Sequence, residues 1–504
     1  MTHVPETSHP DPHQQGRTHG AGVPAEHPQR WRLLALLCLA QFMLIADVTV
    51  INVALPTIGE DLGLDGSGLT WVVTAYTLFF GSLLLLGGRL ADAVGKLRAF
   101  LAGLTVFTAA SIASGLAVGG EMLIVARSAQ GVGAALMSPA AMALVTALFH
   151  GPDRNKALGV WAAIGGAGSA VGVLLGGVFV SGPGWEWVFF INVPVGLVAL
   201  LGVPALLGNS RDLVAPSGAG GSLDLPGALT LTAAPGLLIY GLVQARDHGF
   251  DAPGAWLPLL GALLSAVAFV VVERRVREPL VRLAIFARRT LVGGSVVMLA
   301  ASGLLIASFF LSSFYVQHVL GFSALKTGLV FLPVAVAITL GAHAASHLVA
   351  RLGWRPVGVV AFALTAVGAA LLTRLDADSD VWTDLVPGFA LLSLALGTAF
   401  VCATTAAMNG LPHQDMGLAS GLVSTSHELG AALGVAVIST IAGASLEGGG
   451  GGGGAGVGAG VAGTGGFDNA FTACAIIAAV VAAVGALLLP AGRPDPAQGP
   501  VMAH

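Results

Sequence analysis

The chain has 504 residues, of which 55% are hydrophobic and only 10% are charged. Soluble globular proteins carry about 25% charged residues, so this composition excludes an ordinary soluble domain and indicates an integral membrane protein. The formal net charge of −4 is small and dispersed, which gives no basis for nucleic-acid binding.

The first 29 residues are polar and lack the apolar core of a cleavable signal peptide. We therefore expect residues 1–29 to form a disordered cytoplasmic tail. Residues 491–504, which follow the last apolar segment, are expected to form a second cytoplasmic tail.

Apolar segments long enough to cross a bilayer recur along the rest of the chain. A hydrocarbon core of about 30 Å requires roughly 20 apolar residues in helical conformation. Fourteen windows meet this requirement: 32–54, 68–88, 98–118, 122–147, 157–180, 186–207, 225–245, 254–273, 290–316, 326–347, 355–374, 384–408, 418–444 and 469–490.

Lysine and arginine are distributed unevenly between the predicted loops. With the N-terminus placed inside, the cytoplasmic segments hold 18 of the 22 basic residues. The outer loops hold three, Arg246, Lys326 and Arg374, and Arg127 lies in a span. Because basic loops stay on the cytoplasmic side, we expect a multi-pass protein of the plasma membrane with both termini in the cytoplasm.

The predicted spans fall into three groups along the chain. Residues 30–210 are predicted to form a six-helix bundle, residues 211–287 a two-helix insertion with a basic cytoplasmic linker, and residues 288–490 a second six-helix bundle. A glycine-rich run at 448–466 is expected to be a flexible external loop. Transporters are commonly built from two such repeats, with the substrate site between them.

The first span contains an acid, Asp47, within the stretch LCLAQFMLIADVTVINVALPTIGEDL (37–62). A charge at the bilayer centre costs about 2.5–3.5 kcal/mol on insertion scales, so it indicates a partner or a function. A rise of about 1.5 Å per residue puts Asp47 and Arg127 of the fourth span at similar depths, roughly 12 and 8 Å from the outer surface. We expect them to pair, directly or through water, either as a structural ion pair or as a proton-carrying acid with its cation.

The loop GGRLADAVGKLRAF (87–100) joins the second and third spans on the predicted cytoplasmic face. Its small residues allow two helix ends to approach closely, and the helix dipole favours an acid near a helix N-terminus. The loop resembles the signature loop of the major facilitator superfamily, although Ala93 stands where that family usually has a basic residue. The resemblance implies a gating role for Gly88, Asp92, Gly95, Lys96 and Arg98.

Four longer stretches resemble the fourteen-span drug:proton antiporter branch of that superfamily. They are DVTVINVALPTI (47–58), LIVARSAQGVGAALMSP (123–139), WEWVFFINVPVG (185–196) and GLASGLVSTSHELGAALGVA (417–436). The resemblance implies an all-α integral membrane protein with the major-facilitator fold, in which two six-helix bundles and a two-helix insertion give 14 transmembrane helices. It also implies a part in proton coupling for Asp47. Val173 replaces the usual proline of the fifth-span antiporter motif, so the proline kink is not expected there.

A second acid, Glu428, lies roughly 15 Å into the thirteenth span, close to the bilayer midplane. We expect it either to bind substrate or protons, or to remain protonated within the C-terminal bundle. Four other polar residues are candidates for lining a substrate cavity or bridging helices: Tyr76, Tyr315, Asn52 and Gln130.

Together these features predict a proton-coupled exporter of small hydrophobic or cationic compounds, such as drugs and antibiotics, that works by alternating access. We expect it to act as a monomer in the lipid bilayer, with the proton gradient as its energy source and without a cofactor, a metal or nucleic acid. No nucleophile–base constellation indicates an enzyme. The alternatives are a proton-coupled symporter or importer, a lipid or peptide exporter on the same fold, and a non-transporting membrane sensor.

Overall fold

The computed structural model describes residues 28–149, 151–208, 224–411, 413–443 and 465–492. Most of each predicted tail and nearly all of the glycine-rich run lie outside these residues. Every regular element within the described ranges is a helix.

The long helices follow the predicted spans in order. They are α1 (Arg30–Leu62), α2 (Gly66–Val94), α3 (Lys96–Gly115), α4 (Gly120–Leu148), α5 (Gly151–Ser181), α7 (Asn192–Leu207), α8 (Leu225–His248), α9 (Pro253–Arg275), α10 (Arg289–Phe314), α11 (Ala324–Leu352), α12 (Trp354–Leu372), α13 (Val386–Met408), α14 (His413–Ala442) and α15 (Gly465–Leu488). Short elements precede or extend some of them: α6 (Trp187–Phe190), η3 (Leu283–Ala287), η4 (Tyr315–Val319) and η5 (Val381–Leu385).

Each of the fourteen predicted windows falls on a helix, the sixth on α6 and α7 together. Thirteen helices within the described residues are long and apolar enough to cross a membrane, and α5 occupies the place of the fifth window. Some predicted windows end before the corresponding helix ends. For example, α1 runs past residue 54, contains Pro56, and stops where Gly63 takes a left-handed backbone conformation with φ 60°.

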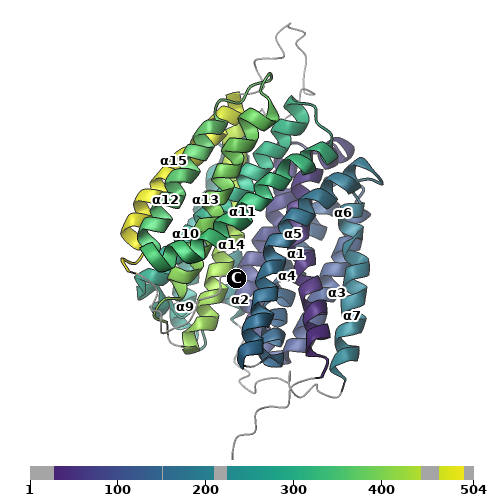
Figure 1. Ribbon diagram of the computed structural model, residues 1–504, viewed down its shortest axis with the longest axis vertical. Coiled ribbons are helices and arrows are strands. Elements are labelled where there is room, and N and C mark those ends of the chain that lie inside the picture. Colours follow the sequence, from purple (N-terminus) through teal and green to yellow (C-terminus); the bar gives the residue numbers. More distant parts are fainter. Residues whose placement is uncertain (1–27, 150, 209–223, 412, 444–464, 493–504) are drawn as a thin grey trace, which may run out of the picture.

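The helices form two groups that stand side by side (Figure 1). In the first group α2 packs on α4, α3 on α4 and α1 on α5; in the second α11 packs on α13, α10 on α14 and α12 on both α13 and α15. The two groups meet mainly where α2 contacts α14 and α5 contacts α11. This arrangement confirms the predicted all-α membrane fold.

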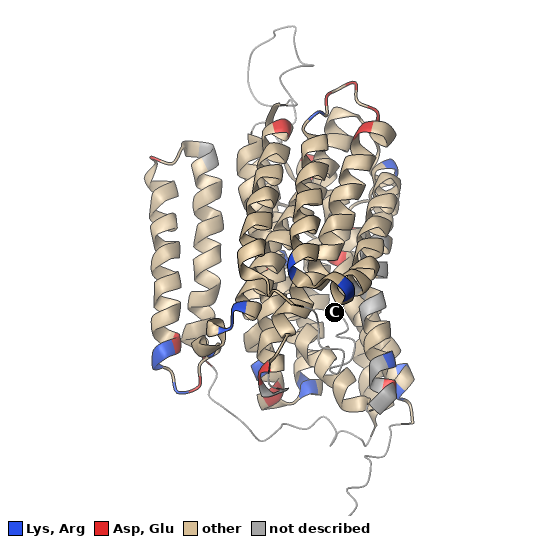
Figure 2. Cartoon of the chain, turned by 60° about the vertical axis from the view of Figure 1, so that its left-hand side comes forward, with Lys and Arg blue, Asp and Glu red and all other residues tan. Residues whose placement is uncertain are grey.

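The hairpin of α8 and α9 lies beside the two groups (Figure 2). Helix α8 packs on both α2 and α14, so it covers the seam between the groups. The apolar cluster at this contact consists of Leu78, Ile239, Val243, Ala432 and Ala436. Only 11% of the most apolar part of α9 is buried in the protein, as expected for a helix that faces lipid.

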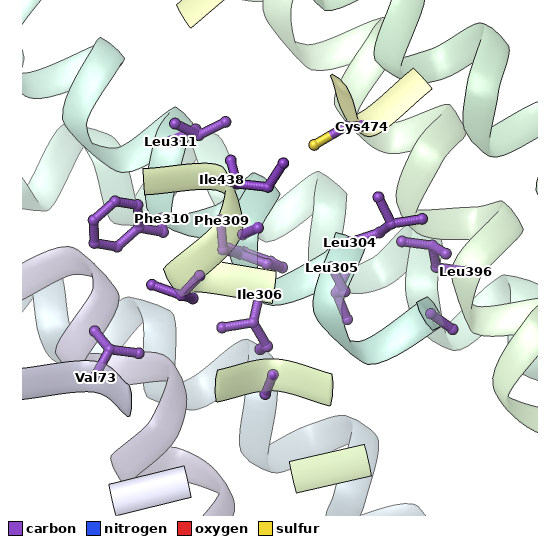
Figure 3. Packing of buried hydrophobic residues seen from close by; sticks show 14 of the residues in the cluster. Val73, Leu304, Leu305, Ile306, Phe309, Phe310, Leu311, Leu396, Ile438 and Cys474 are labelled. Atoms are coloured by element: carbon purple, nitrogen blue, oxygen red, sulfur yellow. The ribbon is translucent and has the colours of Figure 1, made fainter. Parts of the chain in front are cut away.

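Apolar packing also continues from the second group into the first (Figure 3). The apolar residues of α10 between Leu304 and Leu311 lie in one cluster with Leu396 of α13, Ile438 of α14 and Cys474 of α15, and the same cluster includes Val73 of α2. The contact between the groups is therefore largely apolar at this level.

Most of the charged residues lie at the two ends of the helices (Figure 2). We call the end with the α2–α3 turn and residues 276–288 the basic end, because it carries Lys96, Arg98, Arg274 and Arg275. The opposite end, with the α1–α2 turn and the aspartates of loop 373–380, is the acidic end. That the basic end faces the cytoplasm remains a prediction.

Candidate functional site

Asp47 of α1 and Arg127 of α4 form an ion pair inside the first helix group. Asp47 is 2% exposed and Arg127 is 1% exposed. Arg127 Nη1 donates directly to Asp47 Oδ2. The prediction that these two residues pair is confirmed, whereas no finding tests their role.

The other oxygen of Asp47 is held by two amide side chains. Asp47 Oδ1 accepts hydrogen bonds from Asn192 Nδ2 at 3.0 Å and from Gln130 Nε2 at 3.3 Å. Gln130 Oε1 in turn accepts from Arg127 Nη1 at 3.0 Å, and Gln130 Nε2 donates to Ser111 Oγ at 2.8 Å. Arg127, Gln130 and Asn192 thus donate to both oxygens of the carboxylate, and the charge of Arg127 lies directly beside it.

Close helix packing brings these side chains together. Arg127 Nε donates to the carbonyl oxygen of Val72 on α2 at 3.2 Å. One turn along α4, a side-chain carbon at Gly131 would lie 2.5 Å from the carbonyl oxygen of Tyr76, which is too close for any other residue. Gly131 therefore lets α4 approach the backbone of α2 and place the guanidinium against it.

The ring of Tyr76 packs against the guanidinium group of Arg127. The guanidinium carbon of Arg127 is 4.5 Å from the centre of the Tyr76 ring, a geometry that stabilises the cation. The Tyr76 hydroxyl is fully buried and has no hydrogen-bond partner among the described residues.

Glu428 lies on α14 where this helix meets α2. A side-chain carbon at Gly81 of α2 would be 2.6 Å from Glu428 Cβ, so the two helices touch at this level. The carboxylate approaches His427 Nδ1 at 3.3 Å, and its side chain is 14% exposed. Within the described part of the chain, no hydrogen bond or ion pair joins Glu428 to Asp47 or Arg127. Glu428 is therefore a separate acid at the seam between the groups.

Asn52 and Tyr315 lie nearer the acidic end than the network. The carbonyl oxygen of Asn52 accepts a hydrogen bond from Ser313 Oγ of α10 at 2.6 Å, which joins the two helix groups. The Tyr315 hydroxyl donates to the carbonyl oxygen of Asp376 at 2.6 Å, and its ring packs against Phe467. The structure thus places both residues in helix and loop contacts that hold the acidic end together.

The predicted gating loop is a very tight turn at the basic end. Only Gly95 separates α2 from α3, and its φ of 99° is a conformation that favours glycine. Gly88 and Asp92 lie in the last turns of α2, and Lys96 and Arg98 begin α3. The Asp92 side chain is exposed, and α3 has no side-chain N-cap.

Sequence reasoning missed three polar residues that take part in these contacts. Asn192 and Ser111 complete the Asp47 network, and Arg89 of the gating loop donates to the backbone oxygens of Glu278 and Pro279. The signal for Asn192 was present, since it lies in the motif at 185–196. Ser111 is one serine in an apolar helix, and its sequence context does not distinguish it.

Comparison with known proteins gives consistent matches along the chain. The family model described as Major Facilitator Superfamily matches residues 37–435. The sequence is 39% identical over 420 residues to the puromycin resistance protein pur8 of Streptomyces alboniger, covering 82% of each chain. It is 38% identical over 418 residues to the cephamycin export protein CmcT of Amycolatopsis lactamdurans, covering 82% of this chain and 85% of that protein.

The fold is also similar to solved structures. A bacterial homologue of the human lysosomal transporter Spinster superposes with a TM-score of 0.61 at 16% sequence identity, covering 93% of this chain and 99% of that chain.

Proposed function

Because the chain belongs to the Major Facilitator Superfamily, we propose that it exports small hydrophobic or cationic compounds, antibiotics among them, in exchange for protons. The names of two relatives support export: one confers puromycin resistance and the other exports a cephamycin. We infer that it works in the plasma membrane, as a monomer, with its termini and its basic end in the cytoplasm.

The observation that carries proton coupling is the burial of Asp47. An acid retained inside a membrane helix is costly, and such residues mark ion and proton pathways. Asp47 is almost completely buried, yet all of its partners are side chains that a helix movement can withdraw. Its proton affinity therefore depends on conformation.

The mechanism we propose uses the movement of Arg127 relative to Asp47. While the guanidinium contacts the carboxylate, the anion is stabilised and no proton is held. If rearrangement of the helices withdraws Arg127, a buried and unpaired carboxylate becomes unfavourable, and Asp47 takes up a proton. Return of Arg127 then releases that proton on the other side of the membrane.

Substrate binding is proposed at the seam where α2 meets α14. Glu428 offers a negative charge to a cationic compound, and the apolar side chains of the same seam suit a hydrophobic one. Since transporters of this type bind substrate between their two halves, the same rearrangement that moves Arg127 would open and close the seam. No cofactor is required by this scheme, because the proton gradient supplies the energy, and no enzymatic step is involved.

Uptake and efflux experiments with purified protein in liposomes test the proposal. Puromycin serves as a cationic probe, and an imposed proton gradient supplies the drive. We expect puromycin to move against its gradient, and a protonophore to abolish this movement. Co-movement of puromycin and protons in the same direction would indicate the symporter alternative, and binding without flux would indicate the sensor.

A further inference from the structure

Two acids outside the Asp47 network are buried together at the basic end. Asp224 precedes α8 and is 1% exposed, and Glu273 lies in the last turn of α9 and is 4% exposed. A side-chain carbon at Gly227 would collide with Asp224 Oδ2 and lie 2.7 Å from Glu273 Oε1. The two carboxyl groups therefore converge on one small space between the ends of the hairpin.

Both acids hold the linker that leads from the hairpin to α10. Asp224 Oδ1 accepts a hydrogen bond from the backbone N–H of Gly227 at 2.8 Å, as an N-cap of α8. Asp224 Oδ2 accepts from the N–H of Leu280 at 3.2 Å, and Glu273 Oε2 accepts from the N–H of Val281 at 2.9 Å. Leu280 and Val281 are each 1% exposed, so this part of the linker is firmly docked.

The same linker is tied to the first helix group. Arg89 of α2 donates to the backbone oxygens of Glu278 and Pro279. Residues 278–281 are thus held by the hairpin through their N–H groups and by α2 through their carbonyl groups. We call this set of contacts the linker clasp.

One oxygen of the clasp lacks a donor. Glu273 Oε1 is buried, and no residue that the structure describes donates a hydrogen bond to it. The acid that shares this space is Asp224, and Arg89, the nearby cation, donates to the linker backbone instead. A second buried carboxylate at this position repels the first unless a proton lies between them.

We propose that Asp224 and Glu273 form a proton-binding site, separate from Asp47, whose shared proton keeps the linker clasp closed. With one proton bound, Glu273 donates to Asp224, and both acids still accept from the linker N–H groups. When that proton is lost at higher pH, the two carboxylates repel each other. One of them must then move away and release the N–H that it holds. The inference does not depend on the proposed export function.

A spin label on the linker tests the clasp directly. Arg277 is exposed, and the native residues Cys38, Cys402 and Cys474 are buried, so Arg277→Cys can be labelled selectively in the full-length protein. The labelled protein in lipid nanodiscs is followed by electron paramagnetic resonance between pH 6 and 9. We expect the label to be immobile at low pH and to gain mobility as the pH rises. A label at Arg351→Cys, in the last turn of α11, should not respond.

Glu273→Gln is the matched variant, because its amide donates to Asp224 as the protonated acid does but cannot lose that proton. The label at position 277 should stay immobile in this variant over the whole pH range. Asp224→Asn also removes the repulsion between two carboxylates, so the label should not respond to pH, although one of the two backbone N–H groups that Asp224 holds then loses its acceptor and the label can be more mobile at every pH. This variant serves if Glu273→Gln does not fold. An unresponsive label in the otherwise unchanged protein, or an unchanged response in both variants, would overturn the proposal.

Discussion

Asp47 and the Asp224–Glu273 pair are both buried acids, but their charge is compensated differently. Around Asp47 a guanidinium and two side-chain amides donate to the two carboxylate oxygens. Around the pair the donors are backbone N–H groups, and within the described ranges Glu273 Oε1 has no donor. A carboxylate beside a cation is stable as an anion, whereas two adjacent carboxylates need a shared proton. In the two proposals above, the first site changes protonation only when Arg127 moves, and the second responds to pH in place.

Removing the arginine near each site should have very different effects on stability. Arg127→Met leaves Asp47 buried without its cation, and loss of one partner of a buried ion pair costs about 3–5 kcal/mol. Arg89→Met removes hydrogen bonds to two backbone oxygens, each of which typically contributes about 1 kcal/mol. Thermal unfolding of the purified variants in detergent, followed by circular dichroism, measures both losses.

A double variant controls this experiment. Asp47→Asn combined with Arg127→Met removes both charges, so it should regain most of the stability lost in Arg127→Met alone. Equal losses for Arg127→Met and Arg89→Met, or no recovery in the double variant, would contradict the compensation of Asp47 by Arg127.

The environment of Glu428 is intermediate between those of the two sites. Its side chain is partly exposed at the seam, and it contacts a histidine instead of an arginine. Glu428→Gln should lower the export of a cationic compound about tenfold, which corresponds to roughly 1.4 kcal/mol, and spare a neutral compound of similar size. Parallel efflux assays with the two compounds measure this. An equal loss for both would mean that the carboxylate does not contact the cation.

Tyr76 should make the smallest contribution to the stability of the protein, and this contribution should come mainly from its ring. Its hydroxyl has no partner, so Tyr76→Phe should change stability by no more than about 0.5 kcal/mol. Tyr76→Leu removes the ring from Arg127 and should cost more, since a desolvated cation–π contact contributes up to about 2 kcal/mol. The same unfolding assay applies. A Tyr76→Phe loss as large as that of Tyr76→Leu would show that the hydroxyl has a partner after all.

The positions of the spans and of the Asp47–Arg127 pair could be predicted because both depend on local properties. Apolar length defines a span, and residue counting along a helix gives depth. Two opposite charges at similar depth in a medium that penalises each of them are expected to pair. The motif at 123–139 pointed to the same arginine.

The linker clasp could not be predicted in this way. Asp224 and Glu273 stand at the ends of apolar segments, where charged residues are normally solvated, and sequence offers no reason to treat them otherwise. Their burial arises because residues 278–281 fold back over the hairpin and dock on α2. The same limit applies to Glu428, whose depth was predictable but whose position opposite Gly81 depends on how the two helix groups meet.

Proton coupling through Asp47 is tested most directly by Asp47→Asn in reconstituted liposomes under an imposed pH gradient. The amide preserves the shape of the side chain but cannot exchange a proton; it also replaces one of the two hydrogen-bond acceptors of Asp47 with a donor and leaves Arg127 without its anion. We expect drug-dependent proton movement to be abolished and the unfolding temperature to fall, while the protein that remains folded still binds the drug at equilibrium. Asp47→Glu should keep partial coupled activity with an altered pH profile. Coupled transport by Asp47→Asn at the level of the unchanged protein would contradict the account, and the coupling acid would then have to be sought at Glu428.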